Sequence, residues 1–298
     1  MSSLKPLSPS VISNTVFKDD IFRGKVLFCT GGGSGICQKM VEAVMRHGAS
    51  AFIFGRRENL LHSTATQLSR SSTIHRCSYA AGDVRNLESL QKAVQQCIQE
   101  FGRLDFVIAG AAGNFLCPID QLSTNAFRSV VEIDLLGTYN TMKATLPYLK
   151  KTQGSFISVS ATLHYVGTPL QAHVSAAKAG VDALSQVMAV EFGPYGIRSN
   201  IIAPGPISDT EGFSRLSTPN TQKTLAGIIP LQRFGTRDDI ANAAVFLFSP
   251  AASFITANIL VCDGGENHLR ASNMMGLNYP NALVENNGKD FMKGKGKL

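Results

Sequence analysis

A glycine-rich segment near the start of the chain has the composition of a phosphate-binding turn. Its residues are Thr30-Gly31-Gly32-Gly33-Ser34-Gly35-Ile36. The apolar run 26–29 before it is typical of a buried strand, and Met40, Ala43 and Val44 after it share one face of a helix. Glycines let a pyrophosphate approach the backbone, and a helix N-terminus offers unpaired N–H groups and a positive dipole end. We therefore expect this segment to bind a dinucleotide; the alternative is a turn that binds nothing.

Two arginines follow the second apolar run. Residues 51–54 form this run, which ends at Gly55, Arg56 and Arg57. In a dinucleotide fold, a carboxylate at this point binds the ribose hydroxyls of NAD, whereas an arginine favours the 2′-phosphate of NADP. No carboxylate is present at 55–57, so the sequence favours NADP. The alternative is an arginine pair that contacts only solvent.

Small and polar residues also stand where later strands are expected to end. Asp83 follows the stretch 74–81, where it would cap a loop or meet an adenine edge. The apolar run 104–109 leads into Gly110 and the small residues after it. Small residues let a flat cofactor lie against the backbone, and ligands of open parallel sheets bind at these carboxyl ends.

Alternating strand and helix patterns must position these residues. Strands are expected at 25–29, 51–54, 74–81, 104–109, 155–160, 201–203 and 259–262, with long helices at 87–101, 125–149, 172–192 and 237–248. The alternation predicts an α/β fold with one Rossmann-type, doubly wound, seven-stranded parallel sheet and helices on both faces. We expect one domain over 21–266, between a flexible N-terminal arm (1–20) and a C-terminal tail (267–298).

Bulk composition limits the class of partner. The chain has 298 residues, is 44% hydrophobic and 16% charged, and carries a net charge of +7. Its Lys and Arg residues are dispersed without interleaved aromatics, which argues against nucleic-acid binding, and no apolar run reaches the roughly 18 residues of a membrane span. The basic balance suits a polyanionic ligand such as a nucleotide or a coenzyme A thioester. Six scattered cysteines without a CxxC pair favour free thiols over disulfides or a metal site.

The motifs together resemble the short-chain dehydrogenase/reductase superfamily over about residues 22–266. The resemblance is carried by Thr30–Ile36, Asp83-Val84, Ala109–Gly113, Lys178 within 175–180, and Pro204–Ile207. The chain departs from the family pattern at three positions. Cys37 replaces the last loop glycine, Asp134 replaces a helical asparagine, and Val174 replaces the tyrosine expected four residues before Lys178.

The valine at position 174 has a chemical consequence. In carbonyl reduction the tyrosine of the family gives a proton to oxygen as hydride reaches carbon, and a positioned acid contributes about 10²–10⁴-fold to the rate. Valine cannot donate a proton. We therefore expect either an inactive protein or a substrate that needs no proton there, such as a carbon–carbon double bond conjugated with a thioester. Hydride addition to that bond gives an enolate, which needs oxyanion stabilisation first and protonation at carbon later.

Three longer segments resemble the 2,4-dienoyl-CoA reductases, and most of all their peroxisomal branch. They are Gly110–Pro118, Glu132–Asp134 and Pro204–Gly212. The resemblance implies that NADPH delivers hydride to the δ-carbon of a 2,4-dienoyl-CoA. Protonation at the α-carbon then gives a 3-enoyl-CoA, an auxiliary step in the β-oxidation of unsaturated fatty acids. The alternatives are another NADPH-dependent enoyl-CoA or 3-oxoacyl-CoA reductase of the superfamily, or a catalytically silent NADPH-binding protein.

The resemblance also implies roles for single residues. Lys178 would hold the nicotinamide ribose, Asp134 would order a water that protonates the dienolate, and Asn114 would bind the thioester oxygen. The implied cofactor-binding residues are Gly31, Gly33, Ser34, Gly35, Ile36, Arg56, Asp83, Val84, Gly110, Lys178, Pro204, Gly205, Pro206 and Ile207. The implied substrate-binding residues are Arg85, Phe115, Ser123, Thr124, Asn125 and Arg215.

Each of these assignments has a plainer alternative. Asp134 and Lys178 would also suit a structural ion pair, and Ser123 with its neighbours would suit an ordinary helix cap. His164 and Tyr165 follow the strand 155–160, and either would replace the lost proton donor or simply pack in the loop. Leu163, and not Tyr165, stands at the position of the tyrosine used by the mitochondrial branch.

The chain ends in Gly296-Lys297-Leu298, which differs by one residue from the peroxisomal address Ser-Lys-Leu. Together with the resemblance, this end predicts recognition by the peroxisomal import receptor and a place in the peroxisomal matrix, with the cytoplasm as the alternative. The superfamily resemblance implies a homo-oligomer, expected to be a dimer.

Overall fold

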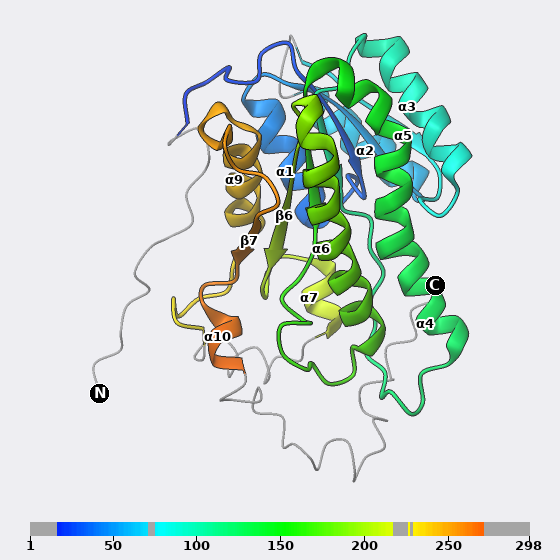
Figure 1. Cartoon of the computed structure of the whole chain (residues 1–298), viewed down its shortest axis with the longest axis vertical. Helices are drawn as coiled ribbons and strands as arrows, with labels where there is room; N and C mark the ends of the chain where they lie inside the picture. Colours follow the sequence, from blue (N-terminus) through cyan, green and yellow to red (C-terminus); the bar gives the residue numbers. More distant parts are fainter. Residues whose placement is uncertain (1–16, 71–74, 217–225, 227–228, 271–298) are drawn as a thin grey trace.

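One parallel sheet runs through the computed structural model, which describes residues 17–70, 75–216, 226 and 229–270. Its seven strands follow the order β3-β2-β1-β4-β5-β6-β7 (Figure 1). The strands are β1 Val26–Thr30, β2 Ser50–Gly55, β3 Cys77–Ala81, β4 Phe106–Ala109, β5 Ser155–Val159, β6 Arg198–Pro204 and β7 Ile259–Cys262. The predicted fold class is confirmed. The chain order reverses direction between β1 and β4, which is where doubly wound sheets bind ligands.

Helices and short turns connect the strands. They are α1 Gly35–Arg46, α2 Glu58–Arg70, α3 Leu87–Phe101, α4 Thr124–Val131, the π-helical turn η2 Glu132–Leu136, α5 Gly137–Thr152, α6 Ala172–Phe192, the 3-10 turn η3 Gly193–Tyr195, α7 Glu211–Leu216, α9 Arg237–Phe248, the 3-10 turn η4 Pro250–Ala252 and α10 Glu266–Arg270. The helices expected at 87–101, 172–192 and 237–248 have these bounds in the structure. The long helix expected at 125–149 is present as the contiguous segments α4, η2 and α5, but the expectation missed the π-helical turn η2 within it.

The sheet is buried on both faces, as its strands' almost continuous apolar sequence requires. Side chains alternate along β1: Leu27 and Cys29 join one hydrophobic cluster with α1, α2 and α9, whereas Val26 and Phe28 join another with α3, α5 and α6. The helix α2 was not among the elements predicted from the sequence. Its buried residues Leu61, Ala65 and Leu68 have the spacing of one helical face, which was the available indication.

The carboxyl ends of the parallel strands meet at one edge of the molecule. Figure 1 shows β6 and β7 pointing toward this edge, where α4, α7 and α10 also lie. The glycine-rich turn after β1 and the loops after β4, β5 and β6 therefore converge there. Among the described residues, no helix has the length and apolar character needed to cross a membrane. The N-terminal arm and the C-terminal tail fall mainly outside the described residues, as does the Gly296–Leu298 end.

Candidate active site

The glycine-rich turn forms one side of a cleft at the carboxyl edge of the sheet. Gly31 has a φ of 73°, and a Cβ atom there would come within 2.9 Å of the Gly110 carbonyl oxygen. Only glycine meets both conditions. Ser34 precedes α1 in extended conformation, and its side chain makes no capping bond to the first turn in the described chain. The N–H groups of that turn are therefore available to an anionic phosphate.

The cleft has a volume of about 450 Å³ and brings most of the predicted residues together. The predicted residues that line it are Gly31, Gly33, Ser34, Gly35, Ile36, Arg56, Asp83, Val84, Gly110, Asn114, Asp134, Lys178, Pro204 and Gly205. Those that do not line it are Arg85, Phe115, Ser123, Thr124, Asn125, Pro206 and Ile207. The side chain of Arg215 lies outside the described part of the structure. Lining residues that sequence analysis did not assign to ligand binding include Cys37, Leu163 and Thr210.

Two arginines lie at one end of the cleft. Arg56 and Arg57 follow β2 with exposed side chains. Arg57 Nη2 donates to Ser34 Oγ at 2.8 Å, and Arg57 Nη1 lies 3.5 Å from Glu211 Oε2 of α7. Arg57 thus connects the glycine-rich turn with α7 across the cleft. One guanidinium group can donate two parallel hydrogen bonds to two oxygens of the same phosphate. This end of the cleft therefore suits a phosphorylated ribose.

Asp83 and Arg85 follow β3 on the same half of the sheet. Three hydrogen bonds join the Arg85 guanidinium to the Asp83 carboxylate at 2.7–3.1 Å. The bond from the guanidinium is the main cause that lowers the pKa of Asp83 below its usual range. The structure therefore places Arg85 against a cofactor-side carboxylate and not in the lining of the cleft, where a substrate contact was expected.

A buried ion pair lies deeper in the cleft. Lys178 Nζ is 3.1 Å from Asp134 Oδ2, and both side chains are almost completely buried. Lys178 also donates to the Val159 carbonyl oxygen at 2.9 Å, and Gly113 N donates to Asp134 Oδ1 at 2.7 Å. These bonds orient both groups, which is the condition for keeping two charges away from water. Asp134 lies in the π-helical turn η2, a type of irregularity that occurs frequently at functional sites.

The cleft has an apolar side chain at the position where the family pattern has a tyrosine. Val174 lines the cleft one helical turn before Lys178 and is buried. Tyr165 does not line the cleft, and burial is the main cause that raises the pKa of its phenol to about 12. Ser160 does line it, and its buried Oγ has no hydrogen-bond partner among the described residues.

The loop after β4 and the start of α6 are joined opposite the ion pair. Asn114 Nδ2 donates to Gln171 Oε1 at 2.8 Å, and the ring of Phe115 meets the buried ring of His173 edge to face, with centroids 4.2 Å apart. Gln171 and His173 were not singled out by sequence analysis. Their buried polar side chains become informative only when the two loops are brought together.

The predicted substrate residues at the start of α4 also have a structural role. Ser123 Oγ accepts a hydrogen bond from Ala126 N at 3.2 Å and therefore caps the helix. Asn125 Oδ1 accepts a bond of 3.4 Å from Arg128. The exposed N-terminus of α4 faces the same edge of the molecule as the cleft. The capping role of Ser123 is therefore compatible with a role in ligand binding.

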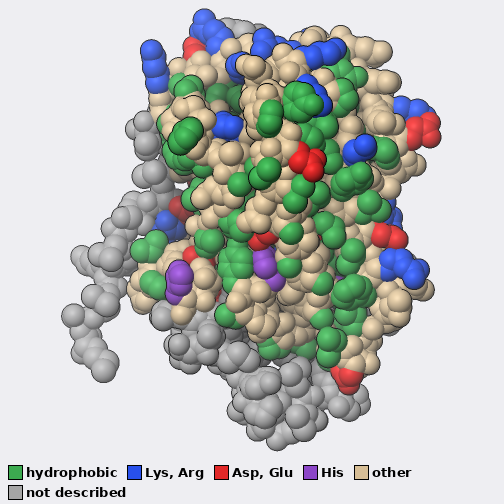
Figure 2. All heavy atoms as spheres, viewed as in Figure 1, with side chains coloured by type: hydrophobic (Ala, Val, Ile, Leu, Met, Phe, Trp, Pro, Cys, Tyr) green, Lys and Arg blue, Asp and Glu red, His purple; other side chains and the backbone are tan. Residues whose placement is uncertain are grey.

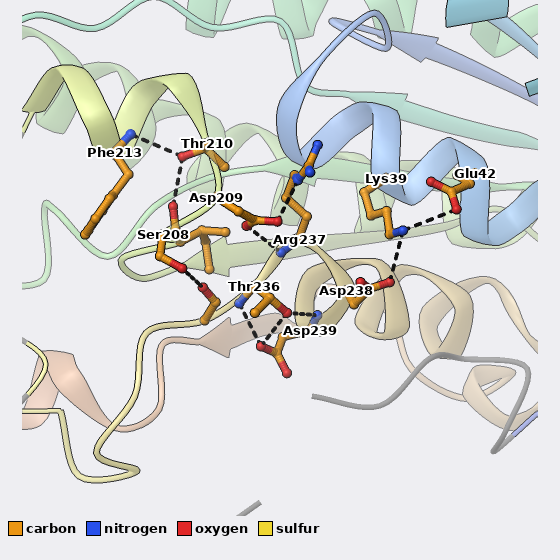
Figure 3. Close-up of polar contacts among 12 residues, drawn as sticks. Lys39, Glu42, Ser208, Asp209, Thr210, Phe213, Thr236, Arg237, Asp238 and Asp239 are labelled. Carbon is orange, nitrogen blue, oxygen red and sulfur yellow. Dashed lines mark hydrogen bonds and ion pairs between the residues drawn. The ribbon is translucent and has the colours of Figure 1, made fainter. Parts of the chain in front are cut away.

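A polar network holds the loop that closes the other side of the cleft. Figure 3 shows Asp209 pointing to Arg237 at the start of α9, with Asp209 Oδ2 2.8 Å from Arg237 Nε. Thr210, which lines the cleft, caps α7 by accepting from Phe213 N at 3.1 Å. Lys39 of α1 meets Asp238 of α9 at 3.5 Å (Figure 3). The loop after β6 is therefore fixed to α9, and α9 to the helix that follows the glycine-rich turn.

Two further observations concern metals and thiols. Among the described residues, no group of three or more His, Cys, Asp or Glu side chains is placed to hold a metal ion. The six cysteines are all described and are free thiols in the structure. Cys37 packs against the cleft, and its Sγ lies 3.5 Å from the Gly110 carbonyl oxygen.

Comparison with known proteins identifies similar sequences and folds. A family model described as Enoyl-(Acyl carrier protein) reductase matches residues 31–267. The chain is 47% identical over 287 residues to the peroxisomal, (3E)-enoyl-CoA-producing 2,4-dienoyl-CoA reductase of Saccharomyces cerevisiae, with 96% of this chain and 98% of that protein covered. It is 45% identical over 252 residues to the protein of the same description from Danio rerio, with 84% of each covered.

Solved structures agree with the sequence comparison. A short chain dehydrogenase from Bacillus anthracis superposes with a TM-score of 0.72 at 36% identity, with 82% of this chain and 96% of that chain covered. Since the sequence match extends over nearly the whole chain, this protein belongs to the short-chain dehydrogenase/reductase family, in the group that contains the peroxisomal 2,4-dienoyl-CoA reductases.

Proposed function

We propose that this protein reduces 2,4-dienoyl-CoA to 3-enoyl-CoA with NADPH, as an auxiliary step in the β-oxidation of unsaturated fatty acids. The relatives support the substrate class. The observation that carries the proposal is the Asp134–Lys178 pair beside Val174 in the cleft. A site with a buried carboxylate and an apolar side chain in place of the tyrosine suits an enolate that is protonated at carbon better than it suits a carbonyl group.

The residues present fit a phosphorylated nicotinamide cofactor. The uncapped first turn of α1 would hold the pyrophosphate, and Arg56 and Arg57 would hold the 2′-phosphate. When bound, the cofactor supplies the hydride. Lys178 would hold the nicotinamide ribose hydroxyls and add positive charge near the reacting atoms. The preference for NADPH over NADH is part of the proposal, and the arginines after β2 are its support.

The chain's own groups would then stabilise and protonate the dienolate. An amide N–H of Asn114 would donate to the thioester oxygen, where negative charge develops. Asp134, oriented by Gly113 N and Lys178 Nζ, would accept a hydrogen bond from a water molecule and direct the other proton of that water to the α-carbon. The hydroxide left behind would take up a proton from the solvent. Arg85, Phe115, Ser123, Thr124, Asn125 and Arg215 stay proposed contacts of the acyl-CoA.

The test is oxidation of NADPH by the purified protein with a 2,4-dienoyl-CoA, a 2-enoyl-CoA or a 3-oxoacyl-CoA, each repeated with NADH. Turnover confined to the dienoyl substrate and much faster with NADPH is the expected result. Comparable turnover of a 3-oxoacyl-CoA would contradict the argument from Val174. Tight NADPH binding without turnover of any substrate would instead indicate a silent binding protein.

We also propose a peroxisomal matrix location, for which the names of the relatives and the Gly296-Lys297-Leu298 end are the support. A fluorescent protein carrying the last dozen residues should enter peroxisomes. Diffuse fluorescence would contradict import through this end. Replacing Leu298 by Asp should abolish import if the receptor recognises the end as proposed.

A homodimer is the assembly that we propose. Figure 2 shows hydrophobic side chains spread over the face viewed in front, where α5 and α6 lie. Val187 and Val190 of α6 and Leu136 of η2 are among the exposed large apolar residues. A partner subunit would remove such side chains from water. Val190→Glu should therefore convert a dimer into a monomer in size-exclusion chromatography with light scattering, whereas a monomeric wild-type chain would refute the proposal.

A further inference from the structure

A buried histidine–carboxylate pair lies beside the cleft and takes no part in the proposed chemistry. His164 belongs to the loop between β5 and α6, and its Nε2 lies 2.7 Å from Asp182 Oδ2 on α6. The two side chains are only 14% and 8% exposed. Polar groups that are withdrawn from water are costly unless they bond to each other, so removing one partner leaves the other unsatisfied. The pair therefore fixes the loop to α6.

The same helix holds this loop at two places. Lys178 Nζ donates to the carbonyl oxygen of Val159, where the loop begins. Asp182 follows Lys178 by four residues, on the same face of α6, and holds His164. Ser160, Ala161 and Leu163 line the cleft within this short stretch. The wall of the cleft on the β5 side is thus secured at each end by a side chain of α6.

This wall belongs to the substrate half of the cleft. In the strand order, β5 lies on the opposite side of β1 from β2, which carries the arginines. Leu163, Val174 and Asn114 line the cleft on the β4, β5 and α6 side. A flat conjugated acyl group that reaches the Asp134–Lys178 pair would therefore pack against Leu163. A small outward movement of the loop would widen this part of the cleft.

We infer that His164 and Asp182 are positioning residues for the acyl-CoA substrate, because their bond seats Leu163 as the wall against the dienoyl group. The inference rests on the proposed function for the identity of the substrate. The loop after β5, whose His164 and Tyr165 were considered above as proton donors, therefore has a role in substrate affinity. Neither residue lines the cleft, so each acts through the position of Leu163.

Tyr165 next to the pair provides a matched control. Its ring centroid lies 4.5 Å from that of His164, and its buried Oη has no hydrogen-bond partner among the described residues. Burial, followed by the charges of Asp182 and Asp263, raises the pKa of the phenol, so the hydroxyl stays protonated. Tyr165→Phe removes the hydroxyl and keeps the ring that packs on His164. It should change neither the loop nor the kinetics.

The experiment compares His164→Leu with His164→Gln, whose amide nitrogen can reach the position of Nε2. For His164→Leu we expect the KM for the dienoyl-CoA to rise about tenfold with a smaller change in kcat, because a lost hydrogen bond to a charged group costs roughly that factor. The dissociation constant of NADPH should stay within about twofold of the wild-type value. This change is well below the tenfold that corresponds to about 1.4 kcal/mol. His164→Gln should restore the KM.

The double variant His164→Leu with Asp182→Leu guards against misfolding, because it leaves no unpaired buried charge. It should fold and show the same raised KM as His164→Leu. A wild-type KM in the folded double variant, or an equal loss of NADPH affinity, would overturn the inference. Hydrogen exchange tests this inference independently of the proposed function. Amides of residues 160–168 should exchange faster in His164→Leu but not in His164→Gln or Tyr165→Phe, whether or not the wild type turns over a dienoyl-CoA.

Discussion

Replacing Asp134 by asparagine tests the proposed protonation step. The substitution preserves the volume and an oxygen atom that can accept the 2.7 Å hydrogen bond from Gly113 N. It removes the negative charge 3.1 Å from Lys178 Nζ. Positioned acid–base groups contribute about 10²–10⁴-fold, so turnover of the dienoyl-CoA with NADPH should fall by about that factor. NADPH affinity should change far less, because the arginines and the turn before α1 remain.

Asp134→Asn should also lower the stability of the fold, and this effect must be measured separately from the effect on turnover. Lys178 is 5% exposed and would keep only the Val159 carbonyl as its partner in the described structure. Breaking a buried ion pair on one side costs about 3–5 kcal/mol, which is a large part of the roughly 5–15 kcal/mol that stabilises an ordinary domain. The variant should therefore unfold at lower urea concentration, and its turnover must be measured where circular dichroism shows it folded.

Asp105→Asn is the matched control for that cost. Asp105 is also a buried carboxylate, bonded to Arg103 at 2.6 Å and to Val26 N at 3.0 Å, but it precedes β4 at the opposite edge of the sheet from the cleft. This variant should lose stability and keep its turnover. Single-turnover measurements at saturating NADPH provide the comparison. If folded Asp134→Asn turns over within tenfold of the wild type, Asp134 does not direct the protonation, and its bond with Lys178 is structural.

Three further predictions concern the cofactor, packing and pH. Arg56→Ala should weaken NADPH binding about 10–100-fold, which corresponds to the roughly 1.5–3 kcal/mol of a hydrogen bond to a charged group. In a fluorescence titration the affinity for NADH should stay unchanged. Equal losses of affinity for both cofactors would refute the role of Arg56 in binding the 2′-phosphate. Gly110→Ala would bring a Cβ atom into steric overlap with Cys37 Sγ and should destabilise the fold by about 1–3 kcal/mol. A second change, Cys37→Ala, should recover much of that loss in urea unfolding, and no recovery would place the strain elsewhere. Burial lowers the pKa of His173, with Asp134 among the groups that oppose the shift, so the unfolded chain takes up this proton first. The free energy of unfolding should therefore decrease as the pH falls below about 6.5, with a slope of up to about 1.4 kcal/mol per pH unit from this residue, and His173→Gln should reduce that slope. An unchanged slope would mean that His173 binds its proton equally well in the folded and the unfolded chain.

Local patterns in the sequence determined the fold class and half of the candidate site. The alternation of apolar runs and helical periodicity predicted the parallel sheet, because each strand–helix unit carries its own signals. The glycine-rich turn, the arginines after β2 and the missing tyrosine at Val174 were also visible, since each depends on residue type at a fixed distance along the chain. Lys178 and Val174 reach the cleft together because a single helix presents both.

Only the tertiary structure decided which groups are paired in and around the cleft. The π-helical turn that carries Asp134 has no sequence signal that distinguished it from the helix expected at 125–149. Asn114 meets Gln171 across 57 residues, and His164 meets Asp182 across 18. Partners of this kind depend on how loops from different strands close over the sheet, and loop conformation follows from packing and hydrogen bonding that no periodicity records.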